Sequence, residues 1–253
     1  MTDHMLVETA NRVTTITFNR PDKKNAITQA MYQTMADTIK AYGEDDNANV
    51  LMITAEGEMF TAGNDLQDFA MGSRDTHELP PVAQFLLAIA SCEKPLIAAV
   101  NGHAIGVGLT LTLHCDLVYA AKSASFSAPF VQLALVPEAS SSLLLPNAVG
   151  MAVANDIIFA GRKLSADEAH QYGMVSRVFS DDTFADEVAA IAAQVAAQSP
   201  RSMKKSKALM RHNRDFVIQH MNRESKDFAE QLQHPDFMES VAAKMQKRAP
   251  NYG

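Results

Sequence analysis

The first half of the chain alternates between strand-like and helix-like hydrophobic patterns. Residues 12–19, RVTTITFN, alternate in polarity and are rich in β-branched side chains, which predicts a strand. Residues 49–57, NVLMITAEG, are apolar on both faces, as in a strand buried within an α/β layer. Between them, Thr28 is a helix-capping residue type, and apolar side chains follow it at helical spacing, namely Met31, Met35 and Ile39. The order strand, helix, strand indicates an α/β fold.

The middle of the chain continues this alternation. Hydrophobic spacing predicts a helix over 82–94, and residues 95–102 read as a buried strand that ends at a glycine. Residues 103–115 begin with a glycine-rich bend and continue as an apolar helix, and residues 116–129 predict one or two strands. The segment PEASSSLLLPNAVG then predicts a helix with Pro137 in its first turn.

The C-terminal part is helical and charged. Ser165 to Glu168 forms a capping box, and Gly173 suits the position that follows a helix end. Residues 186–199 predict an amphipathic helix, and the composition changes at AAQSPRSMKKSK. We therefore expect a core over residues 1–195 and a helical region over 196–253. The methionines of the helical region are consistent with subunit contacts or, equally, with an ordinary hydrophobic core.

Composition narrows the possible functions. A chain of 253 residues, 47% of them hydrophobic, suits one main globular domain with an appendage. The net charge of −7 argues against a nucleic-acid partner, which needs a basic surface. Cys92 and Cys115 form no CxxC pattern, and the eight histidines have no metal-ligand spacing, so neither a disulfide framework nor a metal is expected. Without a signal peptide or an apolar membrane span, a cytoplasmic location is expected.

Two glycine turns stand out as candidate chemistry. FTAGNDL (60–66) and NGHAIGVG (101–108) each follow a strand pattern and open a helix. Such turns leave backbone N–H groups unpaired. One N–H group from each turn, both pointing to the same place, would form an oxyanion hole. The alternative for the first is a plain turn, with Asp65 and Asp68 capping a short helix before a polar loop over 75–81. The second does not match GxGxxG, so the sequence does not favour a dinucleotide site there.

These segments resemble the crotonase superfamily, which includes enoyl-CoA hydratases and isomerases. The resemblance rests on FNRPDKKNAIT, FTAGNDL, KPLIAAVNGHAIGVGLTLTLHCDL, GRKLSADEAHQYGMVSRV and KRAPNY, and it covers nearly the whole chain. It implies a crotonase-like spiral of ββα units and a C-terminal helical trimerisation region. It also implies a homotrimer or a dimer of trimers. The implied substrate is an acyl-CoA thioester, with coenzyme A as part of the substrate and no separate cofactor.

The resemblance also implies the binding residues. The thioester oxygen would accept hydrogen bonds from the backbone N–H groups of Asn64 and Val107, where many relatives have glycine in place of the valine. Lys23 and Lys24 stand where relatives approach the nucleotide end of CoA, although they are equally well read as solvated turn lysines. The implied substrate-binding set is Lys23, Lys24, Ala62, Gly63, Asn64, Asp65, Gly106 and Val107.

The catalytic residue is where this chain departs from the hydratases. Hydratases of the superfamily use two glutamates, and those positions hold Thr110 and Phe130 here. Neither side chain can act as a general base near neutral pH. Glu138, in LVPEASSS, instead matches the single glutamate of the Δ3,Δ2-enoyl-CoA isomerase branch. The alternative is that Glu138 only caps a helix start after Pro137.

The resemblance thus implies an enoyl-CoA isomerase with Glu138 as its base. Other reactions on the same site, such as hydration, another acyl-CoA lyase reaction or thioester hydrolysis, remain alternatives. A non-catalytic acyl-CoA-binding protein is the alternative from a different class. Desolvation would raise the pKa of Glu138 and a helix N-terminus would lower it, and the sequence leaves open which effect prevails.

Overall fold

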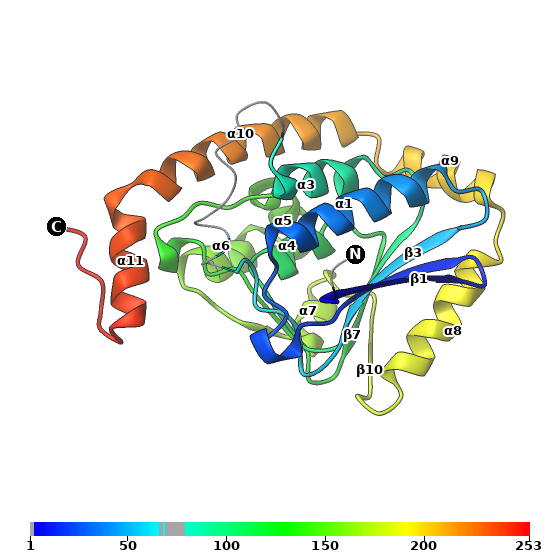
Figure 1. Cartoon of the computed structure of the whole chain (residues 1–253), viewed down its shortest axis with the longest axis horizontal. Helices are drawn as coiled ribbons and strands as arrows, with labels where there is room; N and C mark the ends of the chain where they lie inside the picture. Colours follow the sequence, from blue (N-terminus) through cyan, green and yellow to red (C-terminus); the bar gives the residue numbers. More distant parts are fainter. Residues whose placement is uncertain (1–2, 66–67, 69–78) are drawn as a thin grey trace.

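The computed structural model describes residues 3–65, Asp68 and residues 79–253. Its main sheet has six strands in the order β1-β2-β3-β5-β7-β10 (Figure 1). β1 and β2 form an antiparallel hairpin, and the other neighbouring strands pair in parallel. The strands are β1 (Met5–Ala10), β2 (Val13–Phe18), β3 (Val50–Ala55), β5 (Leu96–Val100), β7 (Leu117–Ala121) and β10 (Arg177–Phe179).

Helices cover both faces of this sheet, which explains why its central strands are apolar on both sides. On one face, α1 (Gln29–Glu44) and α3 (Pro81–Ser91) pack against each other and share the larger hydrophobic core. On the other face, α8 (Phe184–Ala196) packs its apolar side chains on β3, β5 and β7. The α/β layers that the hydrophobic patterns predict are therefore present.

A second, four-stranded sheet carries the short segments between these layers. Its order is β4-β6-β8-β9, with parallel pairs except for the last one. Short helices follow several of its strands. Its elements and their helices are β4 (Met59–Thr61), β6 (His103–Ile105), α4 (Val107–Thr112), β8 (Ser125–Ser127), η2 (Val131–Leu133), α5 (Ser141–Val149), α6 (Met151–Phe159), β9 (Leu164–Ser165) and α7 (Ala166–Gln171). A further 3-10 helix, η1 (Pro21–Lys23), follows β2.

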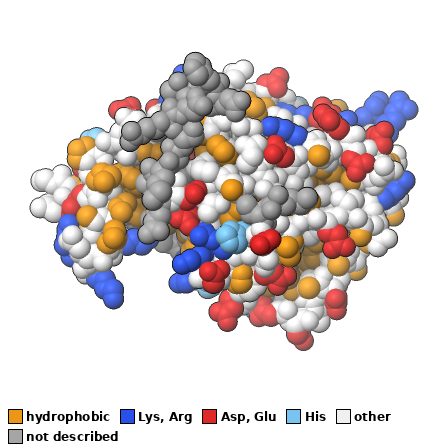
Figure 2. All heavy atoms as spheres, in the orientation of Figure 1, with side chains coloured by type: hydrophobic (Ala, Val, Ile, Leu, Met, Phe, Trp, Pro, Cys, Tyr) orange, Lys and Arg blue, Asp and Glu red, His pale blue; other side chains and the backbone are white. Residues whose placement is uncertain are grey.

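The C-terminal region consists of α9 (Pro200–Met210), α10 (Arg214–Gln233) and α11 (Pro235–Met245). Figure 1 shows α10 passing over α3, and the two helices are in contact. Apolar side chains gather on the surface near α11 in Figure 2, and Met238 and Met245 of this helix are 64% and 81% exposed. The predicted helical character of this region is confirmed, whereas its role in trimerisation and the boundary after residue 195 stay predictions.

Local capping signals agree with the structure. The Thr28 side chain accepts a hydrogen bond from the Met31 N–H at the start of α1, and both halves of the Ser165–Glu168 capping box form. Gly173 follows the end of α7 with a φ of +90°. The patterns missed β1, β4, β6, β9 and β10, and residues 116–129 form two strands that belong to different sheets. The expected short helix after Asp65 lies, apart from Asp68, outside the described residues, as does most of the expected loop at 75–81.

The predicted helix start at Pro137 is wrong. α5 begins at Ser141, after Ala139 and Ser140, which both have a φ of +57°. Two successive left-handed residues form a turn rather than the first turn of a helix. Glu138 therefore lies before the helix, which removes the capping role that its sequence position suggested.

In the described part of the chain, no helix is long and apolar enough to cross a membrane. Cys92 and Cys115 are both buried and free.

Candidate active site

The two glycine turns lie side by side because the strands before them are neighbours. β4 and β6 pair in parallel, so the chain leaves both strands at the same edge of the second sheet. Gly63 has a φ of +90°, and a Cβ atom built on it would lie 3.1 Å from the Ile105 carbonyl oxygen. A side chain there would be strained and would press against the second turn. The glycine thus permits the close approach of the two turns.

The N–H of Asn64 points away from its neighbouring segment. Ile27 and Asn64 form an isolated parallel bridge, in which the Ile27 N–H donates to the Gly63 carbonyl and the Asp65 N–H donates to the Ile27 carbonyl. In a parallel bridge, the N–H of the residue between these two bonds points to the opposite side, away from the neighbouring segment. The Asn64 side chain is fixed as well, because its Oδ1 accepts a hydrogen bond of 2.5 Å from the Tyr32 hydroxyl.

Val107 supplies the corresponding N–H of the second turn. It is the first residue of α4, where backbone N–H groups have no partner within the helix. The preceding Gly106 has φ +59° and ψ −117°, a conformation that suits glycine. A Cβ atom on Gly108 would approach the Thr61 side chain to 2.6 Å, so this glycine lets α4 pack tightly on β4. Both donor-bearing segments are thereby held against each other.

Glu138 is a buried carboxylate next to α4. Its side chain is 9% exposed, and its Oε1 accepts a hydrogen bond of 2.6 Å from the Thr110 hydroxyl. Thr110 follows Val107 by three residues, about one helical turn, or roughly 5 Å along the helix. Burial raises the pKa of Glu138 to about 7, while the Thr110 bond lowers it and the charge of Glu224 raises it. Desolvation, the largest of these effects, therefore prevails.

Tyr32 links the Asn64 turn to the surroundings of Glu138. Its side chain comes from α1 and is completely buried. The pKa of its hydroxyl is raised well above the usual range, first by burial and second by the negative charge of Glu138. The Tyr32 hydroxyl therefore stays protonated and donates to Asn64. Residues from α1, the first turn and the Glu138 segment thus share one buried polar region.

The turn that carries Glu138 is held by hydrogen bonds on both sides. Burial lowers the pKa of His114 to about 4, so its ring is neutral, and its Nε2 lies 2.8 Å from the Ala139 carbonyl oxygen. The buried Ser140 hydroxyl donates to the Val217 carbonyl oxygen of α10 at 2.6 Å. The two left-handed residues therefore have partners that stabilise an otherwise uncommon conformation.

A second buried glutamate comes to this turn from α10. Glu224 is 7% exposed, and its Oε1 accepts hydrogen bonds from the N–H and the hydroxyl of Ser142 at 3.0 and 2.5 Å. The Nε2 atom of His220 lies 2.8 Å from the same hydroxyl. The Glu224 carboxylate thus accepts hydrogen bonds from the first turn of α5, and its negative charge raises the pKa of Glu138.

The remaining predicted residues lie around the first turn. The Ala62 N–H donates to the Lys24 carbonyl oxygen at 2.9 Å, so the lysine turn borders the Asn64 turn. Lys23 and Lys24 are exposed. Asp65 forms an ion pair of 2.7 Å with Arg20, and its other oxygen accepts from the N–H of Asp68, in line with the predicted capping role.

Sequence reasoning missed several residues of this region. It treated Thr110 only as the place of an absent carboxylate, although its hydroxyl bonds Glu138. It also missed Tyr32 and Glu224, which contact the site from distant helices. Their burial is the signal that distinguishes them, and it becomes visible only in the folded chain. Phe130 is buried, in keeping with its lack of a titratable group.

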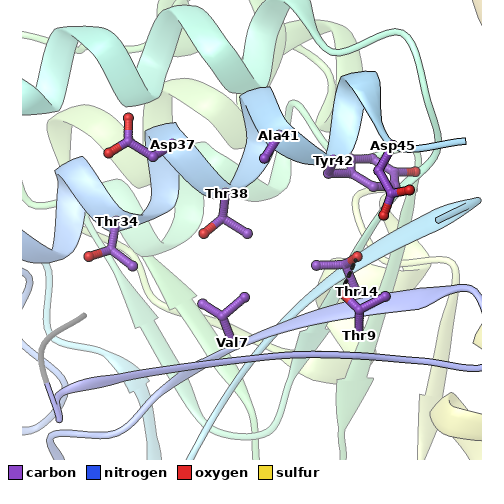
Figure 3. A pocket seen from close by; sticks show the side chains of 9 residues that line it. All are labelled: Val7, Thr9, Thr14, Thr34, Asp37, Thr38, Ala41, Tyr42 and Asp45. Carbon is purple, nitrogen blue, oxygen red and sulfur yellow. Dashed lines mark hydrogen bonds between the residues drawn. The ribbon is translucent and has the colours of Figure 1, made fainter. Parts of the chain in front are cut away.

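Another cavity lies beside α1, away from Glu138. This cavity has a volume of about 430 Å³. Figure 3 shows its lining side chains, which come from the β1–β2 hairpin and from α1 and the residue after it. Polar groups that line it already have partners: Thr9 bonds Thr14 at 3.0 Å, the Tyr42 hydroxyl donates to the Pro95 carbonyl, and Asp37 accepts from a neighbouring glutamine. Burial raises the pKa of Tyr42, which lines this cavity, away from neutral pH, whereas burial brings the pKa of Glu138 to about 7.

A smaller cavity of about 250 Å³ lies beside the Glu138 turn, between η2, α5 and α6. Its lining is mainly apolar and includes Leu135 and Leu145, which are 8% and 0% exposed. Apolar side chains therefore border the Glu138 turn on this side.

Comparison with known proteins identifies the family. Residues 8–253 match the family described as enoyl-CoA hydratase/isomerase. The chain belongs to this family. Enoyl-CoA delta isomerase 2 of Rattus norvegicus is 38% identical over 225 residues, which cover 87% of this chain and 57% of the length of the rat protein. The 2,3-dehydroadipyl-CoA hydratase of Escherichia coli (strain K12) is 31% identical over 254 residues, 98% of each chain.

Solved structures agree with this assignment. A crystal structure titled enoyl-CoA hydratase/isomerase, from Pseudoalteromonas atlantica T6c, is 50% identical, covers 99% of this chain and 100% of that chain, and has a TM-score of 0.94. Membership of the enoyl-CoA hydratase/isomerase family confirms the resemblance to the crotonase superfamily and its fold. The protein is therefore an acyl-CoA enzyme of this superfamily. The names of its relatives cover more than one reaction.

Proposed function

We propose that the protein is an enoyl-CoA isomerase that moves the double bond of a 3-enoyl-CoA to the 2-position. The observation that carries this proposal is the burial of Glu138 against α4, one turn beyond Val107. Thr110 and Phe130 replace the two carboxylates that water addition requires. One carboxylate is enough for an isomerase, because it can return the same proton that it removes.

The proposed reaction has two proton transfers and no net change of atoms. The Glu138 carboxylate takes a proton from the α-carbon, and the electrons of that C–H bond form a dienolate whose charge lies on the thioester oxygen. The N–H groups of Asn64 and Val107 stabilise this oxygen as hydrogen-bond donors. The protonated Glu138 then gives its proton to the γ-carbon, and the double bond forms at the 2-position.

The acid–base properties of Glu138 suit both steps. A pKa of about 7 lies close to neutral pH, so the group can be a carboxylate before the first step and an acid before the second. The apolar surroundings exclude water that would compete for the proton. Removing a donor from an oxyanion hole costs roughly 3–4 kcal/mol of transition-state stabilisation, so the two N–H groups carry a large share of the effect.

The other proposed properties concern binding and assembly. Exposed Lys23 and Lys24, next to the Ala62 turn, are proposed to meet the phosphates of CoA, which is part of the substrate. The exposed methionines of α11 favour a subunit contact in a homotrimer or a dimer of trimers. Two buried free cysteines are compatible with the proposed cytoplasmic location.

Product analysis tests the proposal. The protein is incubated separately with a 3-enoyl-CoA and a 2-enoyl-CoA, and the products are identified by chromatography. Conversion of the first to 2-enoyl-CoA is expected. Formation of 3-hydroxyacyl-CoA from the second would indicate a hydratase, and free CoA would indicate a thioesterase.

Glu138→Gln is expected to lower isomerase turnover by several orders of magnitude while acyl-CoA binding stays near normal. The amide cannot accept the α-proton but has nearly the same shape. Turnover is measured under saturating substrate, and binding by titration calorimetry. Glu168→Gln, on the surface of α7, serves as the matched control. Undiminished turnover in Glu138→Gln would remove the proposal, and binding without turnover in the unmodified protein would indicate a non-catalytic binding protein.

A further inference from the structure

The Thr110 hydroxyl is the one described hydrogen-bond partner of the Glu138 side chain. The two oxygens are 2.6 Å apart, and Thr110 is completely buried. We infer that Thr110 is a positioning residue for the base: its hydroxyl fixes one carboxylate oxygen and leaves the other to carry the proton. This inference rests on the proposed isomerase function and assigns a role to a position where the hydratases have a carboxylate.

The Thr110 hydroxyl has a single proton and two acceptors within reach. The Val107 carbonyl oxygen lies at 3.5 Å, and Oε1 of Glu138 lies at 2.6 Å. The shorter contact, to a charged acceptor, is the stronger hydrogen bond. The proton therefore points to Oε1. If the carboxyl were protonated on Oε1, the hydroxyl would have to turn to the distant carbonyl, so protonation is favoured on Oε2.

This arrangement has a consequence for the geometry of the reaction. Val107 and Thr110 lie one turn apart on α4, so a single short helix carries a proposed donor for the thioester oxygen and the group that orients the base. Tight packing of Gly108 on Thr61 fixes this helix against the first glycine turn. The proposed base and the proposed oxyanion donors are therefore held in one frame, which would fix the substrate carbons for proton transfer.

Other groups that face Glu138 do not replace this bond. Glu224 of α10 carries a negative charge and raises the pKa of Glu138, opposite to the effect of Thr110. Tyr32 of α1 donates to Asn64. His114 is neutral and contacts the Ala139 carbonyl rather than the carboxylate. His220 reaches the turn through Ser142. Thr110 is therefore the group whose removal should free the carboxylate to rotate.

The test compares Thr110→Val, which keeps the shape but lacks the hydroxyl, with Thr110→Ser, which keeps the hydroxyl. For the valine variant, kcat at pH 7 should fall about 10- to 100-fold with little change in KM, because a hydrogen bond to a charged group is lost. The midpoint of the pH profile should move up by roughly one unit. The serine variant should retain the wild-type midpoint. Thr110→Ala is a second hydroxyl-free variant in case valine impairs folding.

A readout without substrate keeps the inference independent of the reaction. The protein is labelled with ¹³C at the glutamate carboxyl, and the Glu138 signal is assigned by its loss in Glu138→Gln. Its pKa should rise in Thr110→Val and Thr110→Ala and stay near the wild-type value in Thr110→Ser. An unchanged pKa in both hydroxyl-free variants would overturn the inference.

The two proposals fail in different ways. If Glu138→Gln retains turnover, the proposed function is wrong, whatever the Thr110 variants do. If Glu138→Gln is inactive but Thr110→Val keeps the wild-type kcat and pH midpoint, the positioning role is wrong and the isomerase function stands. A serine variant that behaves like the valine variant would also overturn the role, because the hydroxyl would then not be the decisive group.

Discussion

Glu138 and Glu168 are two glutamates near helix starts, and their surroundings are opposite. Glu168 is the third residue of α7, where it accepts from the Ser165 N–H and hydroxyl and pairs with Arg162 at 2.7 Å. These bonds lower its pKa to about 2. Glu138 precedes α5, has the Thr110 hydroxyl beside it and is buried, and its pKa is raised to about 7. The same residue type is thus a permanent charge at one helix start and a titrating group at the other.

This difference teaches how to separate the two interpretations that the sequence allowed for Glu138. A capping glutamate gains from ionisation because backbone N–H groups and cations surround it. A buried glutamate loses solvation when it ionises, so it exchanges its proton near neutral pH. Environment, and not the neighbouring sequence, decides between structural and chemical roles.

The largest effect expected from the difference between Glu138 and Glu168 is the pH dependence of turnover. The rate should fall about tenfold for each pH unit below about 7, because Glu138, the proposed base, can accept the α-proton only as a carboxylate. Steady-state rates between pH 5 and 8 measure this, and Glu168→Gln should leave the curve unchanged. A rate that stays constant from pH 8 down to 5 would contradict the raised pKa of Glu138.

The second effect is on stability, with opposite signs for the two glutamates. A carboxyl whose pKa rises on folding favours the folded state most below its unfolded value, 4.5, and loses this contribution as the pH rises through about 7. Glu138→Gln should therefore raise the free energy of unfolding near pH 8 by on the order of 2–3 kcal/mol, with a smaller gain at pH 5.

For Glu168 the sign is reversed, because its pKa is lower in the folded protein than in the unfolded chain. Its contribution is present above 4.5 and is lost as the pH falls through about 2. Glu168→Gln should lower the free energy of unfolding at pH 7. Urea titrations of both variants at pH 5 and 8 check the comparison, and a loss of stability in both at pH 8 would break it.

The smallest expected effect comes from Glu224. Its charge raises the pKa of Glu138, so Glu224→Gln should shift the midpoint of the rate profile to lower pH. The shift, under about one unit, should increase the rate at pH 6 by a few-fold. The amide oxygen can still accept from the Ser142 N–H, so the turn should keep its structure. A shift to higher pH would mean that loss of the contact, rather than of the charge, dominates.

Sequence patterns predicted those features that depend on neighbouring residues. The Thr28 cap and the Ser165–Glu168 box each lie within one helical turn, so their residue types alone indicate them. The two glycine turns were also found locally. The two turns are adjacent because β4 and β6 pair in parallel. Both strands are too short for their patterns to be recognised in the sequence.

The surroundings of Glu138 could not be predicted in the same way. Pro137 favours a helix start, but the following left-handed residues are fixed by partners far along the chain, His114 and Val217. Thr110 lies 28 residues before Glu138, and Glu224 lies 82 residues after Ser142. Such pairings depend on the tertiary packing of several helices, and no local propensity encodes them.

The bonds from α10 to the Glu138 turn also bear on how the protein matures during synthesis. A growing chain that has passed residue 196 already contains every strand named above, together with the segments of Asn64, Val107 and Glu138. It still lacks Val217 and Glu224, which hold Ser140 and Ser142. The turn that carries Glu138 therefore reaches its final shape only after α10 has left the ribosome, later than the strands of both sheets.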